Sequence, residues 1–369
     1  MRTVYSVFGL VAIGLASSAY ADITFGGARA AGMGGAGLAL PVDIGNNYRM
    51  NPAFLAYGSK APTFQWPGIG YKLDGVSLGN VRDVVGTIDE GGLDSSGILQ
   101  LARQYANGPK AVSFNANLGF KFGGFAIGGK GEAGINSIPN AVLQQWVNNG
   151  GDVNNVPAGS RLDAYGYGYQ QLEVGYGNSI RTTAGKFTIG ANVKRIKAYY
   201  AHKYADQATI SNNNEAGVAN GSGIVGDFAT KESTGVDLGL LYNFPKVNNL
   251  YIGTVIENFI EPKISFDYEA PGGGQPIVPG GFDPYKRTFN VGLGYVQDKL
   301  LMAADLIDIG NHAGGQQLRY GAEYAIGKDI YFRAGYNSLT AFTYGLSFGG
   351  FNVQIGGKVP LSITSAIRF

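Results

Sequence analysis

Apolar and polar residues alternate along most of the chain. Residues 112–122 place Val, Phe, Ala, Leu, Phe and Phe at every second position, with Ser, Asn, Asn, Gly and Lys between them. Because successive side chains of a strand point to opposite faces, this period predicts a strand with one apolar face. The same alternation returns over 236–242, 289–295, 318–324, 330–336, 342–348 and 351–355. The sequence therefore predicts an all-β protein.

The connections between the expected strands are sorted by length. Strands are expected over 61–73, 110–122, 124–133, 161–177, 184–200, 231–243, 249–259, 285–297, 300–310, 316–325, 329–337, 341–348, 351–357 and 361–369. The first, third, fifth and seventh connections are long, whereas the even-numbered ones are short. Soluble sandwiches have no reason to sort loops in this way, but outer-membrane barrels do. We therefore predict a transmembrane antiparallel β-barrel of about 14 strands, with short helices in the long extracellular loops.

The N-terminus has the layout of a secretory signal peptide over residues 1–21. A positive start, Met1-Arg2-Thr3, precedes an apolar run over 4–15 and the small-x-small site Ala19-Tyr20-Ala21. A buried N-terminal helix is the less favoured alternative. Beyond residue 21 no apolar run reaches the length of a helical span, so any membrane span must be a strand.

Composition removes several classes of protein. The 369 residues include 60 Gly and no Cys, with 15% charged residues and a formal net charge of +2. This balance argues against a nucleic-acid binder, and the lack of Cys excludes disulfides and thiolate metal sites. Frequent apolar and aromatic residues argue against disorder.

A glycine-rich segment near the N-terminus matches the dinucleotide-binding pattern G-x-G-x-x-G. Residues 32–37 carry it, but Pro41 and Asn46-Asn47 follow instead of a helix, and no acidic residue lies over 45–58. The chain before the motif is also too short for a βαβ unit. Close-packed backbone in a compact segment is the favoured interpretation.

Two stretches near the N-terminus carry a recognisable motif. They are residues 26–36, Gly-Gly-Ala-Arg-Ala-Ala-Gly-Met-Gly-Gly-Ala, and 51–56, Asn-Pro-Ala-Phe-Leu-Ala. Together they resemble the start of FadL-superfamily barrels, in particular the PorV-like and TraF-like branches of that superfamily. Similar blocks lie at 237–242, 304–306, 320–324 and 332–336, so the resemblance spans most of the mature chain. Met50 stands where the family usually has an aromatic residue. The last strand, ending on Phe369, resembles the C-terminal signal by which barrel-assembly machinery recognises bacterial outer-membrane barrels.

The resemblance implies a 14-stranded barrel in the bacterial outer membrane, with residues 22–60 folded into the lumen as a hatch and residues 61–369 forming the barrel. The hatch motif comprises Gly32, Gly34, Gly35, Asn51, Pro52 and Ala53. FadL-type members pass hydrophobic compounds, such as fatty acids, by diffusion. PorV-like members instead assist secretion, and the TraF-like branch implies no defined activity. The expected partners are outer-membrane lipid and hydrophobic small molecules, with no nucleic acid.

The face opposite the apolar positions is expected to line the lumen. It carries Lys121, Lys194, Asp237, Glu257, Asp305, Arg319, Glu323 and Arg333. Because a buried charge must be paired or hydrated, ladders among these residues and with the hatch are the favoured interpretation. The alternative is ligand binding, with Arg319 and Arg333 holding the carboxylate of an amphipathic molecule. Lys121 and Lys194 are further cationic candidates.

Two long loops are expected to contain helices that could capture apolar substrate or simply cap the barrel. Leu99, Ala102 and Tyr105 share helical spacing, as do Val142 and Trp146 after Pro139. A further row, Tyr165, Tyr167 and Tyr169, shares a face with Glu173. It is either an aromatic girdle or wall surface above the membrane.

Enzymatic function is not expected. His202 and His312 are the only histidines, and both are expected in external loops without a convincing Ser-His-acid constellation. No His-Glu-x-x-His or comparable metal spacing occurs. We therefore expect no cofactor, metal or catalytic residue.

Overall fold

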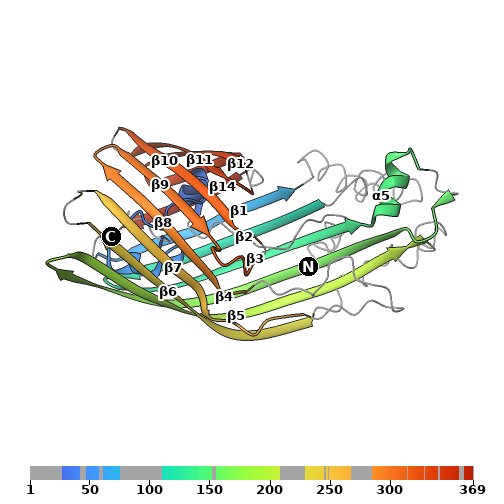
Figure 1. The fold of residues 1–369 in the computed structure, drawn as a ribbon, viewed down its shortest axis with the longest axis horizontal. Helices are drawn as coiled ribbons and strands as arrows, with labels where there is room; N and C mark the ends of the chain where they lie inside the picture. Colours follow the sequence, from blue (N-terminus) through green and yellow to red (C-terminus); the bar gives the residue numbers. More distant parts are fainter. Residues whose placement is uncertain are drawn as a thin grey trace.

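The computed structural model describes most of the chain from residue 27 onward (Figure 1). The described residues are 27–41, 47–57, 61–74, 110–151, 155–207, 229–244, 247, 249–266, 285–313, 315–327, 329–339, 341–356 and 361–368. The expected signal peptide, Leu99, Tyr105 and Phe369 lie outside these ranges.

The described residues form fourteen antiparallel strands that close into one barrel. The strands are β1 (Thr63–Asp74), β2 (Lys110–Phe122), β3 (Phe125–Pro139), β4 (Arg161–Thr182), β5 (Gly185–Asp206), β6 (Ala229–Asn243), β7 (Leu250–Ile260), β8 (Thr288–Gln297), β9 (Leu300–Ile307), β10 (Gln317–Gly327), β11 (Ile330–Asn337), β12 (Ala341–Phe348), β13 (Phe351–Gly356) and β14 (Leu361–Arg368). Each strand pairs with its sequence neighbours, and β1 pairs with β14. The prediction of a fourteen-stranded antiparallel barrel is confirmed.

The barrel wall is much taller on one side than on the other. Strands β4 and β5 have 22 residues each, whereas β11 and β12 have 8. Figure 1 shows the long strands β3, β4 and β5 extending well beyond the short ones, toward helix α5 (Ala141–Asn148). The predicted end of the fifth strand at residue 200 is wrong, because β5 continues to Asp206. His202 accordingly lies in a strand, paired with Tyr165, and not in a loop.

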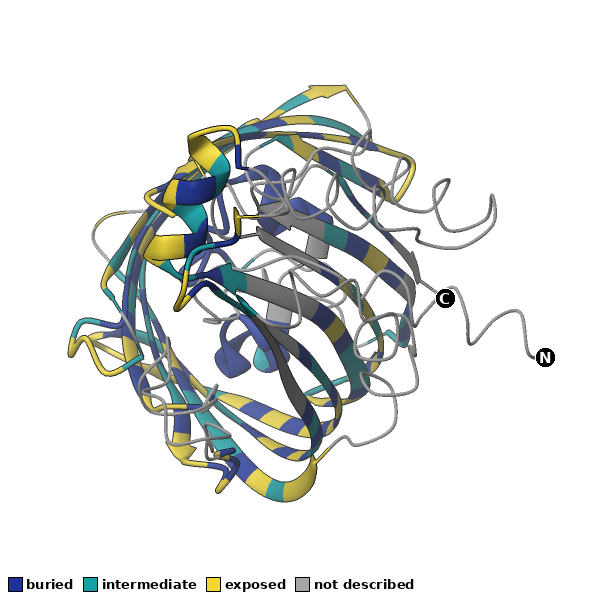
Figure 2. Ribbon diagram, turned by 90° about the vertical axis from the view of Figure 1, so that its right-hand side faces the viewer, coloured by how far each residue is buried: buried dark blue, intermediate teal, exposed yellow. Residues whose placement is uncertain are grey.

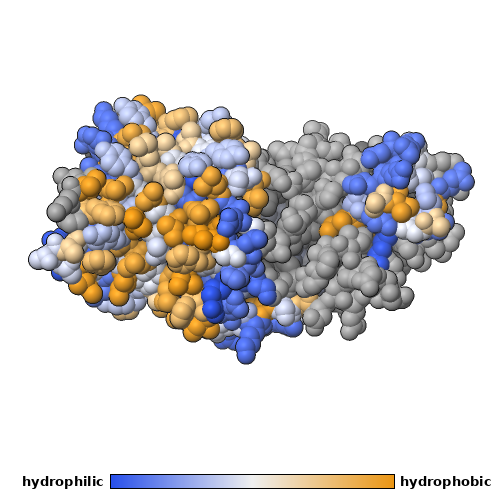
Figure 3. Space-filling model, viewed as in Figure 1, coloured by the Kyte–Doolittle hydropathy of each residue, from blue (hydrophilic) through white to orange (hydrophobic). Residues whose placement is uncertain are grey.

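Most of the outer face is apolar, as expected for a surface that meets lipid. Large hydrophobic residues on alternate positions of β2, β4, β10 and β12 are exposed. In Figure 3 the apolar side chains gather over β6 to β9 and border a hydrophilic band. The inward positions of the same strands carry buried polar residues and glycine. Charged and polar groups therefore occupy the lumen, where they can pair with one another.

Part of the N-terminal region, residues 27–41 and 47–57, occupies the lumen, and we call these residues the plug segment. It contains helix α2 (Gly27–Gly32) and two 3₁₀ turns, η1 (Asn47–Arg49) and η2 (Pro52–Ala56). Helix α2 contacts β11 to β14, whereas η2 contacts β4 to β6 on the other side of the barrel. Figure 2 shows these elements as buried ribbon inside the ring of strands. The segment therefore crosses the lumen from wall to wall.

Candidate functional site

The plug segment approaches the wall where inward positions are glycine. A Cβ atom at Gly294 would lie 2.5 Å from the Ala39 carbonyl oxygen, and one at Gly177 would lie 2.9 Å from the Ala56 nitrogen. Real Cβ contacts under 3.0 Å are essentially never observed. Glycine in these strands weakens the sheet locally, so its presence marks a close approach of another backbone. The inward glycines of the alternating pattern therefore create space for the plug segment.

The motif residues Gly34 and Gly35 need glycine for a different reason. Their φ angles are 71° and 80°, in the left-handed region that a side chain disfavours. This turn directs the Gly34 N–H to the Thr343 hydroxyl at 3.0 Å. The G-x-G-x-x-G pattern thus forms a tight turn against β12.

Glu323 on β10 joins the plug segment to the wall. Its carboxylate accepts a hydrogen bond from the Arg29 guanidinium of helix α2 at 2.8 Å, and another from Arg333 on β11. All three side chains are almost completely buried, with Glu323 only 1% exposed. Such an arrangement costs desolvation, and removing one member would leave an uncompensated charge.

Glu173 on β4 forms the matching connection on the opposite wall. It is paired with Arg49 of η1 and accepts hydrogen bonds from the Tyr48 hydroxyl and the Gln171 amide, both at 3.0 Å. Burial raises the pKa of the Tyr48 phenol, and the Glu173 carboxylate raises it further. The phenol therefore remains a hydrogen-bond donor at physiological pH.

Further polar groups hold the middle of the plug segment. The Asp305 carboxylate accepts hydrogen bonds from the backbone N–H groups of Gly37 at 2.7 Å and Leu38 at 3.0 Å. The Asn51 amide donates to the carbonyls of Leu38 at 2.8 Å and Leu240 at 3.2 Å. Its side-chain oxygen accepts from the Ala53 N–H at 3.0 Å, which caps η2. Asn51 therefore links two parts of the plug segment to β6.

A further charged pair, largely buried, lies beside the Glu173 anchor, because Lys194 is the strand partner of Glu173. Lys194 on β5 is 2.6 Å from the Asp237 carboxylate on β6. The same carboxylate accepts from the backbone N–H of Asn258 at 2.7 Å, where β7 carries a residue with φ of 51°. This pair connects three adjacent strands.

An aromatic cluster covers the inner face of the tall wall. It contains Tyr169, Ile196, Ala198 and Tyr200 from β4 and β5, with Ile264, Phe266 and Tyr285 from the segments that flank the β7–β8 connection. The rings of Tyr200 and Phe266 stack with centroids 5.4 Å apart, and Tyr169 meets Tyr285 edge to face at 6.0 Å. We call these seven residues the outer aromatic cluster.

Tyr167 and Tyr169 of β4 face inward, so these two residues do not belong to an aromatic girdle on the outer face. The hydroxyls of Tyr167 and Tyr169 donate to the buried carboxylate of Glu132 on β3, at 3.0 Å and 3.4 Å. The hydroxyl of Tyr285 is buried without a hydrogen-bond partner among the described residues. The cluster thus combines a large apolar area with a few polar groups.

The predicted site residues are dispersed through the lumen. Arg319 contacts the Gly35 carbonyl at 3.4 Å and Gln317 at 2.8 Å, and Lys121 donates to the Tyr57 carbonyl at 2.6 Å. Arg333 is engaged by Glu323. Contacts with the plug segment or neighbouring strands thus occupy these groups, and their role toward a ligand stays a prediction.

The expected loop helix around Val142 and Trp146 is present as α5. Asn140 caps its N-terminus by accepting from the Leu143 N–H at 3.0 Å. Trp146 packs with Leu143 and Val156, whereas Val142 is exposed. The residues that sequence reasoning missed are Arg29, Arg49 and Glu173 as plug anchors. Both arginines belong to the plug segment, but their carboxylate partners are more than 100 residues away along the sequence.

The described ranges contain no group of three or more His, Asp or Glu residues placed to hold a metal ion. They also contain no helix with the length and hydropathy needed to cross a bilayer.

The closed, plug-filled antiparallel barrel with an apolar outer face defines the class, an outer-membrane-type β-barrel. Residues 95–308, more than half of the chain, match the family described as "F plasmid transfer operon, TraF, protein". The chain belongs to this family. The TraF-like branch of the sequence resemblance is thereby confirmed.

Two solved barrels described as hydrocarbon transporters or channels share the fold of this chain. The toluene transporter TbuX of Ralstonia pickettii matches with a TM-score of 0.53 and 14% identity, over 94% of this chain and 99% of that one. A TodX monoaromatic hydrocarbon channel mutant matches with a TM-score of 0.51 and 11% identity, over 92% and 96%. No curated protein matches by sequence. At these identities the likeness shows a common fold, which is that of FadL-like barrels.

Proposed function

We propose that this protein is an outer-membrane barrel that lets hydrophobic small molecules, fatty-acid-like or hydrocarbon, cross passively. The observation that carries the proposal is the outer aromatic cluster on the inner face of the tall wall. An apolar molecule entering from the long-loop side would pass these rings before it reached the plug segment, and an apolar lining with few polar groups is typical of ligand sites. The fold shared with toluene and monoaromatic hydrocarbon channels supports the same class of cargo.

We also propose residues 1–21 as a signal peptide and 22–60 as the hatch. The hatch would have to shift for cargo to pass, because the plug segment crosses the lumen between β11–β14 and β4–β6.

Arg319 reaches the Gly35 carbonyl through a long hydrogen bond of 3.4 Å, whereas Arg333 is held by a buried carboxylate. Arg319 is therefore the better candidate to exchange a plug contact for the carboxylate of an acidic cargo.

Uptake of labelled toluene and labelled oleate, by cells with and without the protein, tests the proposal. We expect faster uptake with the protein, and a loss of that gain in Phe266→Ser, which removes a ring from the cluster. Phe266→Leu is the matched control because it keeps an apolar side chain at that position. Arg319→Gln should slow the uptake of oleate more than the uptake of toluene. Equal slowing of both would refute the role of Arg319 in binding the carboxylate of the cargo. Uptake that does not depend on the protein would refute transport.

A second candidate is a role in secretion or conjugation-linked assembly, and the family match favours it. This role predicts stable co-purification of envelope proteins with the chain and no dependence of uptake on it. Affinity purification from crosslinked cells, run beside the uptake assay, separates the two. Protein-dependent uptake with no crosslinked partner would refute the assembly role.

A further inference from the structure

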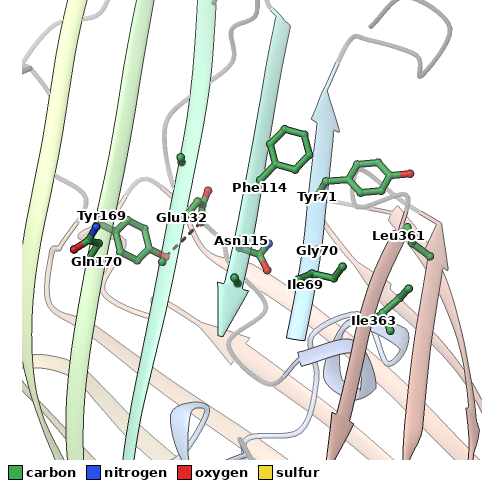
Figure 4. A pocket seen from close by; sticks show the side chains of 13 residues that line it. Ile69, Gly70, Tyr71, Phe114, Asn115, Glu132, Tyr169, Gln170, Leu361 and Ile363 are labelled. Atoms are coloured by element: carbon green, nitrogen blue, oxygen red, sulfur yellow. Dashed lines mark hydrogen bonds between the residues drawn. The ribbon is translucent and has the colours of Figure 1, made fainter. Parts of the chain in front are cut away.

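A groove of about 580 Å³ crosses five strands of the barrel wall (Figure 4). Its lining comes in short runs, residues 69–71 of β1, 114–116 of β2, 131–133 of β3 and 169–170 of β4, with Leu361 and Ile363 of β14. In Figure 4 Leu361 and Ile363 lie at one end and Gln170 lies at the other.

The groove opens on the lipid-facing side of the wall. The outward side chains of these runs are exposed or half-buried, with Ile69 and Phe114 more than half exposed, whereas Gly70 and Glu132 lie on the inward face and are buried. The ring of Tyr71 contacts that of Phe114, with centroids 6.3 Å apart, and forms one wall. Ala116, Gly131 and Ala133 are small, so the floor is backbone and methyl groups. The groove is thus a narrow apolar channel against the hydrocarbon layer.

Strand register shows how the groove is inclined to the membrane. One hydrogen-bonded row runs through Ile363, Ile69, Ala116, Gly131, Gln170, Lys197 and Glu232, from β14 to β6. On β2 the row lies below the exposed Phe114, inside the apolar belt. On β5 it lies beyond Arg195, the first charged outward residue after the exposed Val193. The row therefore rises out of the apolar belt as it approaches β5.

The height that the row climbs between β14 and β5 equals the hydrocarbon thickness of one leaflet. With strands about 4.8 Å apart and tilted by about 40°, a row climbs about 3 Å per strand. From β14 to β5 this amounts to about 15 Å, half of a hydrocarbon core about 30 Å thick. The rise is toward the long-loop side, which faces the outer leaflet in an outer-membrane barrel.

Two cations stand at the upper end of the groove. The Arg195 guanidinium is 2.9 Å and the Lys197 ammonium is 3.4 Å from the same Glu232 carboxylate. The Arg195 side chain is 74% exposed, so it is free to bind a second anion. One carboxylate shared by two cations leaves a net positive charge beside the end of an acyl-sized groove.

We propose that this groove and the Arg195–Lys197 pair form a binding site for lipid A, the phosphorylated and multiply acylated glycolipid of the outer leaflet. One acyl chain lies along the row from Gln170 to Ile363, and a phosphate contacts Arg195 and Lys197. The proposal rests on the outer-membrane location of the barrel and is independent of what the lumen transports.

Native mass spectrometry of the full-length purified protein, titrated with hexa-acylated bisphosphorylated lipid A, tests the site. We expect Arg195→Gln/Lys197→Gln to weaken binding about tenfold, because two exposed charge contacts are lost. Arg181→Gln/Lys299→Gln removes the same charge at the opposite end of the barrel and should leave binding unchanged. Ala116→Leu/Ala133→Leu fills the groove without touching the lumen and should also weaken binding.

Each alternative outcome contradicts a stated part of the proposal. Unchanged binding in the Arg195–Lys197 variant, or equal weakening in the control, overturns the phosphate contact. Unchanged binding in the groove-filled variant overturns the acyl channel. Dephosphorylated lipid A should bind about as weakly to the wild type as lipid A binds to the charge variant. If phosphatidylglycerol binds as tightly as lipid A and is lost equally in that variant, the site is a general anionic-lipid site and the assignment is wrong.

Discussion

Replacing Glu323 by Gln should release the plug segment from the wall. The substitution leaves Arg29 of α2 and Arg333 of β11 buried without their shared carboxylate. Removing one partner of a buried ion pair costs about 3–5 kcal/mol, because a desolvated charge is left uncompensated. The whole cost falls on the closed state of the plug segment if opening hydrates the Arg29 guanidinium.

Hydrogen exchange at the plug amides measures this opening directly. The N–H groups of Gly34 and Leu38 bond to side chains of β12 and β9, so they exchange only when the plug segment moves. A destabilisation of 3 kcal/mol corresponds to about 150-fold faster exchange. Mass spectrometry of amide exchange on the protein in detergent resolves a change of this size.

Glu232→Gln is the matched control for this experiment. Glu232 is also shared by two cations, but its side chain is 42% exposed, and water screens exposed ion pairs so that they contribute little to stability. Plug exchange should therefore be unchanged in that variant. If Glu323→Gln leaves the exchange of Gly34 and Leu38 within threefold of the wild type, the buried pair does not hold the plug segment.

Two further predictions concern the close fit between plug segment and wall. Gly335→Val should place a side chain against the backbone of Met33 and so make the plug segment accessible to protease in the folded barrel. Gly129→Val, at an outward-facing position, should leave the plug segment protected. Equal rates of plug cleavage in the two variants would contradict the close fit. Asn51→Ala removes the cap of η2 and two hydrogen bonds to carbonyls, including that of Leu240. The free energy of opening of the plug segment, measured by amide exchange at increasing urea concentration, should fall by about 2–4 kcal/mol. An opening free energy equal to that of the wild type would show that the turn is stable without its cap.

The alternating pattern identified the faces of the strands correctly within the membrane. Lipid contacts one face along the whole belt, so selection for apolar residues there is continuous and can be read from sequence. The pattern does not decide which face Tyr167 and Tyr169 occupy, because β4 and β5 rise above the apolar belt. Above the belt the outer face meets water and the inner face packs on Ile264 and Phe266. The apolar residues of the strand therefore move from its outer face to its inner face.

The sequence predicts which residues face the lumen but not how they pair there. The inward charges were identified by their phase, and the preference for ladders follows from the cost of burying unpaired charge. Their pairing could not be predicted, since Arg29 and Glu323 are 294 positions apart. Nothing local distinguishes Glu323 from Glu257 as the partner of the plug segment.

The sequence alone determined the strand period, the number of strands, the sorting of loops and the family, because these depend on repeats and motifs along the chain. Tertiary structure decided which carboxylate holds which arginine, where the wall becomes tall and which glycines receive the plug segment. These depend on barrel closure, since strand register brings residues hundreds of positions apart to the same depth in the lumen.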